Sequence, residues 1–394
     1  MPFKEMSAVS QREEFCRLAE ASGANMSDLC RHYGISRTTG YKWLGRYRQD
    51  GAEGLEDRSR RPRRSPGRTA ASVEERVLAL RAEYPCWSGR KLKVLLEAEK
   101  LPEVPSASTI TEILRRHGKL TGPGAGEARD HVRFEHPEPN DLWQMDFKGH
   151  FALENGTRCH PLTLLDDHSR FALEIGACGD ERTATVRARL ERLFQCYGLP
   201  SRILADNGPP WGTAGPERHT PLTVWLLDLD IRVSHGRPYH PQTQGKEERF
   251  HRTMKAEVIA RESFTDLADA QRGFDAWREI YNSIRPHEAI GMKAPASRYT
   301  SSTRAMPDKI DPPEYDTGVD IRKVDSAGRL MFQGRKIRCP KAFVGKQLAL
   351  FATKTDGVFD LRYRRHVLAQ VDLRQNVTQT VHHVPEQVST LSPV

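Results

Sequence analysis

Apolar residues recur at helical spacing up to residue 120, whereas the middle of the chain carries short apolar stretches separated by turn residues. Residues 10 to 50 are predicted to form three helices. Gly34 and Ile35 suit the turn before the third helix, and the Ser36 hydroxyl can cap its free backbone amides. The predicted inward positions are Phe15, Leu18, Leu29, Tyr41, Leu44 and Tyr47. We therefore expect a helix-turn-helix domain over residues 1 to 57.

The third predicted helix carries polar and basic residues on its outer face. Their spacing would let them reach base edges and phosphates in a major groove of DNA. The alternative is a small three-helix bundle whose polar face is simply solvated. The candidate DNA contacts on this helix are Arg37, Thr38, Lys42 and Arg46.

Residues 58 to 71 form a basic linker that is too rich in charge and proline to pack as a core. Arginines at this density would release counterions when they lie along phosphates. A solvated spacer is the alternative. The candidate phosphate contacts here are Arg60, Arg61, Arg63 and Arg64.

Residues 72 to 120 repeat the helical pattern and end near Gly118, which predicts a second helix-turn-helix-like domain. Two such domains in series would read an extended DNA site. A glycine-rich hinge over residues 121 to 133 follows. The candidate phosphate contacts of the second domain are Arg90, Lys91, Arg115 and Arg116.

The middle of the chain predicts an α/β domain with a mixed sheet over residues 134 to 300. Helical spacing is found at residues 181 to 197, 244 to 260 and 267 to 284. Three strands followed by strands that alternate with helices is the order of ribonuclease-H-like folds, although other α/β folds fit the pattern alone. The predicted strands are residues 141 to 147, 158 to 165, 171 to 177, 201 to 205 and 231 to 235.

The last part of the chain predicts a polar linker over residues 301 to 318, then a small β-barrel of five short strands over residues 319 to 375. The tail over residues 376 to 394 is expected to be disordered. The exposed basic residues of the barrel would suit contacts with DNA or a second protomer, and a purely structural cap is an equal alternative. The chain as a whole is therefore expected to be multidomain.

Composition narrows the class of partner. The 394 residues carry a formal charge of +9, which favours a polyanion, and DNA in particular, over a charge that serves solubility alone. No apolar run is long enough for a membrane helix, and no signal peptide is evident, so we expect a cytoplasmic protein associated with DNA. The seven cysteines lack zinc-binding spacing and suit a reducing compartment.

Three acidic residues stand in settings that a fold can bring together. Asp146 lies within the first predicted strand, Asp206 follows a later strand, and Glu248 lies early on a helix. Three carboxylates within about 4 Å of one another would repel by roughly 4 kcal/mol per pair, so such a cluster needs cations. Oxygen ligands favour two Mg²⁺ or Mn²⁺ ions, which promote phosphoryl transfer. Each residue alone also has an ordinary explanation, as a turn, a strand or a salt-bridge residue.

The surrounding motifs resemble the integrase core shared by retroviral integrases and bacterial insertion-sequence transposases of the DDE type. The resemblance implies that Asp146, Asp206 and Glu248 are the catalytic, metal-binding residues. The motifs that carry it are Trp143-Gln144-Met145-Asp146, Asp166-Asp167-His168-Ser169-Arg170, Asp206-Asn207-Gly208, Tyr239-His240-Pro241-Gln242-Thr243-Gln244-Gly245, Glu248-Arg249-Phe250, Tyr281-Asn282, Arg285-Pro286-His287, Pro295 and Tyr299.

Two positions depart from that family pattern. Glu247 occupies a place that is usually apolar or small, which leaves open which glutamate is catalytic; Glu248 is chosen because it lies three residues after the motif glycine. The segment of residues 209 to 220 is longer than the family minimum. It is either a loop that touches DNA or a passive insertion. Arg252 and Lys255 share the helix face of Glu248 and are candidate DNA contacts.

The resemblance implies a DDE transposase that binds the ends of a mobile element. It would hydrolyse a phosphodiester to expose a 3′-hydroxyl, and this hydroxyl would attack target DNA. Joining two ends in one event implies at least a homodimer on DNA. The alternatives are a non-catalytic DNA-binding regulator that retains the scaffold, and a ribonuclease-H-like nuclease without strand transfer.

Overall fold

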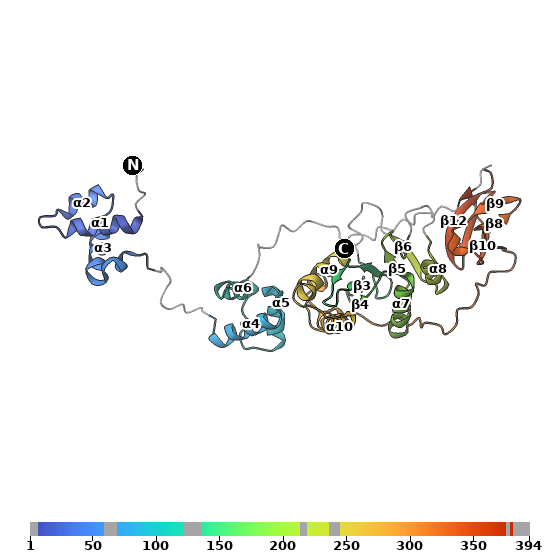
Figure 1. Cartoon of the computed structure of the whole chain (residues 1–394), viewed down its shortest axis with the longest axis horizontal. Helices are drawn as coiled ribbons and strands as arrows, with labels where there is room; N and C mark the ends of the chain where they lie inside the picture. The colour runs from blue at the N-terminus through green and yellow to red at the C-terminus, as the bar shows by residue number, and fades with distance from the viewer. Residues whose placement is uncertain are drawn as a thin grey trace. The chain divides into compact units, whose positions relative to one another are not determined.

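The computed structural model describes residues 7–58, 69–120, 135–212, 219–235, 245–375 and 379–380. The chain divides into two compact units, Met1–Thr69 and Ala70–Val394, and each is described by itself. Figure 1 shows the order of the elements along the chain. The predicted hinge over residues 121 to 133, the arginines of the basic linker and most of the predicted tail lie outside the described residues.

The first unit contains three helices in the predicted places, α1 (Ala8–Ala19), α2 (Met26–His32) and α3 (Arg37–Asp50), followed by a 3₁₀ turn, Gly51–Leu55. The Ser36 side chain accepts a hydrogen bond of 3.2 Å from the Thr39 amide, so the predicted cap is confirmed. The buried core of this unit is made of Phe15, Cys16, Cys30, Trp43, Leu44 and Leu55.

Two of the predicted inward positions in this unit are wrong. Leu18 is 41% exposed and Tyr41 is 52% exposed. Trp43, which is 7% exposed, occupies the core instead, and its larger apolar surface fixes the rotation of α3 about its axis. Tyr41 therefore lies on the outer face of the helix.

The second unit begins with a helical module made of α4 (Ala71–Glu83), α5 (Gly89–Ala98) and α6 (Ala107–Arg116). Its own apolar core is supplemented by Ile280 from the later helix α10 (Leu267–Ser283). A polar contact joins the same two parts, because the Trp87 indole donates a hydrogen bond of 3.4 Å to the Glu257 carboxylate, which is also paired with Arg285. The module therefore packs directly on the following α/β domain.

The α/β domain has the predicted mixed sheet. Its strands are β1 (Trp143–Phe147), β2 (Phe151–Ala152), β3 (Arg158–Asp166), β4 (Ala172–Cys178), β5 (Arg202–Ala205) and β6 (Arg232–His235). β1, β3 and β4 pair antiparallel, whereas β5 is parallel to both β1 and β6. The three-strand meander followed by parallel strands is the predicted order; the two-residue strand β2 was not predicted.

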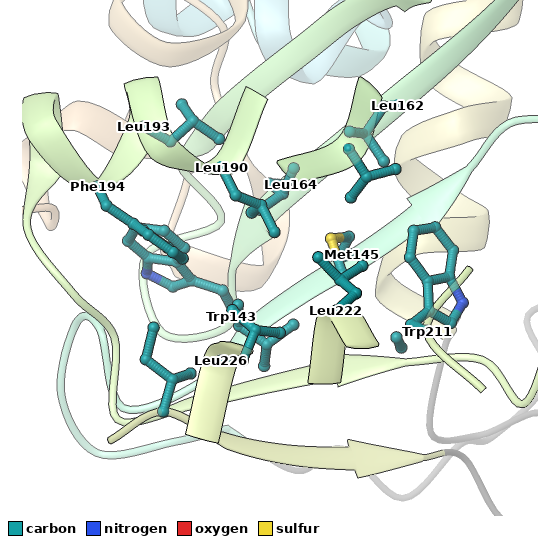
Figure 2. Packing of buried hydrophobic residues seen from close by; sticks show 14 of the residues in the cluster. Trp143, Met145, Leu162, Leu164, Leu190, Leu193, Phe194, Trp211, Leu222 and Leu226 are labelled. Carbon is teal, nitrogen blue, oxygen red and sulfur yellow. The ribbon is translucent and has the colours of Figure 1, made fainter. Parts of the chain in front are cut away.

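Alternation along the strands gives the sheet two different faces. Trp143, Met145, Leu162 and Leu164 point to the face covered by α7 (Thr183–Tyr197) and α8 (Pro221–Asp228), where Figure 2 shows them packed against Leu190, Phe194 and Leu222. The intervening residues face α9 (Gly245–Met254), a π-helical turn (Lys255–Ile259) and α10. Asp146 and Thr163 belong to this second face.

Helix α8 was not predicted, because nearly all of its residues are apolar and no helical period stands out. Both sides of the helix are buried. Leu222 and Leu226 pack in the core of the α/β domain, whereas Val224 and Leu227 pack with the carboxyl-terminal strands. The helix therefore joins two hydrophobic cores, and polar residues would be costly on either side.

The carboxyl-terminal domain forms two sheets from β7 (Asp320–Lys323), β8 (Arg329–Phe332), β9 (Arg335–Arg338), β10 (Gln347–Ala352), β11 (Val358–Tyr363), β12 (His366–Asp372) and β13 (Gln379–Thr380). Their orders are β12-β11-β10-β7 and β13-β9-β8. Among the described residues no ladder closes these sheets into one, so the small β-barrel stays a prediction. β13 pairs with β9, contrary to the expectation of disorder for those two residues.

The short 3₁₀ turns of the second unit are Glu288–Ile290, Pro295–Ser297 and Lys341–Phe343. Among the described residues no helix is long and apolar enough to span a membrane.

Two glycines of α3 allow a matched test of its packing. A Cβ on Gly40 would lie 2.6 Å from Cys30 Sγ and 2.8 Å from Phe15 Cζ, whereas a Cβ on Gly45 would meet nothing within 4 Å. We expect Gly40→Ala to destabilise the first unit by about 1–3 kcal/mol through overpacking. Gly45→Ala should stabilise it by about 0.5–1 kcal/mol through helix propensity.

Hydrogen exchange of the α1, α2 and α3 amides in the full chain measures both effects as changes in opening free energy. Equal changes for the two variants would contradict the packing around Gly40.

Candidate active site

The register of β1 and β5 brings two of the predicted acidic residues together. Trp143 pairs with Ile203 and Gln144 with Leu204 in parallel. Continuing this register by two residues places Asp146 beside Asp206, and neighbouring strands lie about 4.8 Å apart. The sheet itself therefore sets these two carboxylates side by side at one edge.

The electrostatics of Asp146 agree with this placement. Burial raises the pKa of Asp146 to about 7, and the charge of Asp206 adds to the rise. The Asp146 side chain is 27% exposed, so it is still open to a ligand. A carboxyl group in this position gains from a cation that replaces its lost hydration.

Asp206 is fixed by contacts from the loop that follows it. The Gly208 amide donates a hydrogen bond of 3.0 Å to its Oδ1, and the Trp211 indole donates to the same atom. The Asp206 carbonyl oxygen lies 2.7 Å from His235 Nδ1 on β6. Trp211 is 2% exposed and stacks on Phe147 at 5.4 Å between ring centroids. The start of the segment at residues 209 to 220 thus supports Asp206, a role that sequence reasoning missed.

Helix α9 presents its two adjacent glutamates differently. Glu247 is 1% exposed and faces the sheet, where Thr163 Oγ donates a hydrogen bond of 3.1 Å to its Oε2. His251 Nε2 lies 3.6 Å from the same oxygen, and Oε1 has no hydrogen-bond partner among the described residues. Burial, together with the Asp146 charge, raises the pKa of Glu247 well above its usual range.

Glu248 lies on the exposed face of the same helix together with Arg252 and Lys255. This is the predicted stripe, in which the two basic residues follow the glutamate by one and two turns. The structure therefore places Glu247 near Asp146, which lies beside Asp206, and it leaves Glu248 at the surface with Arg252 and Lys255.

The donor set suits a hard divalent cation. Asp146 and Asp206 are hard oxygen donors side by side, and burial together with the Asp206 charge raises the pKa of Asp146, so a cation there would be favoured. Among the described residues no three histidine, cysteine or carboxylate side chains stand in metal-binding geometry. The residues fit such an ion in chemistry, and the third ligand has to come from α9.

The chain was compared with known protein families. Integrase core domain models match residues 136–241 and 229–295. A helix-turn-helix domain model matches residues 11–63, and a homeodomain-like domain model matches residues 39–114. The model of the IS481 family transposase carboxyl-terminal domain matches residues 319–379. In all of these regions the chain therefore matches an insertion-sequence transposase with an integrase core.

Two curated relatives of this transposase family come from insertion elements. An uncharacterized 31.7 kDa protein of IS407 from Burkholderia multivorans is 29% identical over 43% of this chain and 58% of its own length. An uncharacterized 39.2 kDa protein of IS476 from Xanthomonas euvesicatoria is 29% identical over 55% of this chain and 57% of its own length. The chain thus spans less than two thirds of either relative.

A solved structure of the HTLV-2 integrase catalytic core domain in complex with magnesium is also similar. It is 14% identical, covers 42% of this chain and 99% of its own chain, and superposes with a TM-score of 0.32.

Some of the residues of the helix-turn-helix domain that were predicted to contact DNA are exposed. Arg37, Thr38 and Lys42 are exposed on α3, next to the exposed Tyr41. Arg46 is half-buried, with its guanidinium 5.0 Å from the Trp43 ring centroid. Arg60, Arg61, Arg63 and Arg64 lie outside the described residues.

Other predicted contacts of this transposase-family chain have protein partners. The Arg90 guanidinium lies 3.5 Å from Glu288, and burial lowers the pKa of Lys91 to about 7 near Arg285. Arg116 pairs with Glu74 at 2.7 Å, and Arg115 pairs with Glu112. Lys91 in particular faces the integrase core rather than solvent, which its spacing on a helix could not reveal.

The raised pKa of Asp146 predicts a pH-dependent stability. The folded protein holds this proton up to about pH 7, whereas the unfolded chain releases it near pH 3.8, the ordinary pKa of an aspartate, so the stability of the metal-free protein falls as pH rises through that window. Asp146→Asn should therefore raise the free energy of unfolding at pH 8. The increase should be at most about 4 kcal/mol, because each pKa unit corresponds to about 1.4 kcal/mol.

Thermal unfolding in the presence of EDTA, from pH 4 to pH 8, measures this difference. It should shrink toward zero at the acidic end; a difference independent of pH would contradict the burial of an ionising Asp146.

Proposed function

We propose that this protein is a metal-dependent DNA transposase in which Asp146, Asp206 and Glu248 form the catalytic triad. The observation that carries the proposal is the pair of carboxylates set side by side by the parallel register of β1 and β5, with the pKa of Asp146 raised by burial and by Asp206. A protein that only binds DNA has no use for two repelling carboxylates at this edge. The family membership supports the same reaction class.

Two Mg²⁺ or Mn²⁺ ions held by the three carboxylates would supply activation of the attacking oxygen and stabilisation of the leaving oxygen. Asp146 and Asp206 bind from the rigid sheet, and Trp211 keeps the Asp206 carboxylate oriented. Glu248 approaches from the exposed face of α9. The attacking group is water in the first step and the freed 3′-hydroxyl in the second, so no protein nucleophile is required.

The substrate is double-stranded DNA, both at the element ends and at the target. Arg252 and Lys255 are exposed beside Glu248 and would hold phosphates near the carboxylates. The exposed face of α3 would enter a major groove at the element end. A dimer or higher oligomer would align two ends, and a small carboxyl-terminal barrel would complete the protomer.

Cleavage and strand transfer test this proposal directly. Duplexes from the DNA that flanks the coding region are incubated with the full chain and Mg²⁺ or Mn²⁺, and nicked and joined products are resolved. We expect Asp146→Asn, Asp206→Asn and Glu248→Gln to lower the rate on the order of 100-fold or more. Glu247→Gln is the matched control on the same helix turn and should keep most of the activity.

Each outcome distinguishes a candidate. Full activity of Glu248→Gln together with loss in Glu247→Gln would move the third catalytic role to Glu247. Cleavage without joining would indicate a nuclease without strand transfer, and specific binding without either reaction would indicate a DNA-binding regulator.

The placement of two lysines predicts different effects on DNA binding. Lys42 is exposed on α3, whereas Lys91 is half-buried near Arg285, Glu257 and Glu288. Lys42→Ala should weaken end binding and reduce the slope of log K against log salt by about 1, as for one lost phosphate contact. Lys91→Ala should leave the slope unchanged. Fluorescence anisotropy at several salt concentrations measures both, and equal slopes for the three proteins would contradict the role of α3.

A further inference from the structure

A single buried carboxylate in the turn between β3 and β4 links the two elements that carry catalytic residues. Asp167 is 0% exposed. Its Oδ1 accepts a hydrogen bond of 2.7 Å from the Gln144 side-chain amide and forms an ion pair with Lys246. Its Oδ2 accepts a hydrogen bond of 2.9 Å from the His136 amide. Both oxygens are therefore engaged by this chain, which removes Asp167 as a competing metal ligand.

The partners of Asp167 lie next to the candidate triad in sequence. Gln144 is on β1, two residues before Asp146 and on the same face of the sheet. Lys246 is in the first turn of α9, immediately before Glu247 and Glu248. The Asp167 carboxylate thus connects the strand of the first acid to the helix of the third.

The surroundings of Gln144 and of the first turn of α9 show what Asp167 contributes to each. The Gln144 Oε1 atom has no hydrogen-bond partner there, so Asp167 orients this side-chain amide. The later part of α9 is held by apolar packing of Phe250 and Met254, which fixes the body of the helix. Its first turn is polar and depends on Lys246 and Glu247 for inward contacts.

We propose that Asp167 and Lys246 are positioning residues that hold the first turn of α9 at the Asp146–Asp206 pair. This inference rests on the proposed function, because it assumes that a glutamate of α9 completes that site. The pair acts through helix placement, and neither residue touches substrate.

Charge in the surroundings makes the pair mutually dependent. Burial lowers the pKa of Lys246 to about 8, and Asp167 opposes that shift. Arg170 and Glu135 also face the ammonium group, and they are paired with each other at 3.0 Å. Removing one member of the Asp167–Lys246 pair takes a directly contacting counter-ion from the other, which is more costly than removing both.

Asp166 offers a matched control from the same turn. It is also 0% exposed, but its carboxylate accepts hydrogen bonds only from Asn140 and Ser169 among the described residues, at 2.6 to 2.8 Å. Asp166→Asn therefore weakens the turn without touching α9. A merely structural role for Asp167 would make the two substitutions equivalent.

The test uses the full chain with Lys246→Met, Asp167→Asn, the double variant and Asp166→Asn. The first readout is hydrogen exchange of the residue 245–254 amides without metal. The second is the apparent affinity for Mn²⁺, followed through tryptophan fluorescence, since Trp211 donates to Asp206. The third is the cleavage rate on flanking-DNA duplexes.

We expect each single variant to speed exchange in α9 at least tenfold and to weaken Mn²⁺ binding about tenfold, as for other residues that support metal ligands. The double variant should be no worse than either single one, because the pair acts as a unit. Asp166→Asn should lower the Tm while leaving α9 exchange and Mn²⁺ affinity within about twofold of the parent.

Additive losses, or losses of Tm with unchanged α9 exchange and Mn²⁺ affinity, would overturn the inference. If Asp167→Asn fails to fold, Lys246→Met alone carries the same comparison, because its apolar stem is retained. Failure of the proposed function has a different signature, since the parent would then bind Mn²⁺ and protect α9 but join no DNA.

Discussion

Electrostatic repulsion between Asp146 and Asp206 is the constraint on which the catalytic domain depends. Parallel pairing of β1 with β5 sets the two carboxylates side by side. Two such charges about 4 Å apart repel by roughly 4 kcal/mol at an effective dielectric near 20. Burial, and then the charge of Asp206, raises the pKa of Asp146 in the metal-free protein, because a held proton removes a charge that is both desolvated and repelled. The rest of the domain has to stabilise a sheet that carries this cost at its edge.

The two faces of the sheet divide that work. The face toward α7 and α8 is continuous apolar packing, so it supplies stability without polar groups that need partners. The opposite face carries Gln144, Thr163 and Asp146, and its buried polar atoms are matched by Asp167 and by polar side chains of α9. Hydrogen bonds on the face toward α9 thus position the acidic residues. Apolar packing on the face toward α7 and α8 supplies the free energy that offsets their repulsion.

Local periodicity in the sequence was enough to predict most strands and helices of this domain. The settings of Asp146 within a strand and Asp206 at the end of another led us to expect that a fold could bring them together. The same reasoning failed where two parts of the chain bury one element. Helix α8 has no polar side because it packs on both the sheet and the carboxyl-terminal domain. Lys91 looked like a phosphate contact, but the integrase core covers it. A helical pattern shows which side is apolar, and it does not show which polar residues a second domain will contact.

The choice between Glu247 and Glu248 is the clearest case of that limit, because adjacent residues on a helix point about 100° apart and only tertiary contacts fix the rotation. Packing of Phe250 and Met254 turns Glu247 inward, where one of its oxygens already contacts Thr163 and His251. Glu248 shares the outer face with Arg252 and Lys255, which under the proposed function would hold substrate phosphates. A carboxylate engaged by its own fold has less to offer an incoming cation than one beside the substrate. This division favours Glu248 as the ligand and gives Glu247 the role of seating the helix against the strand that bears Asp146.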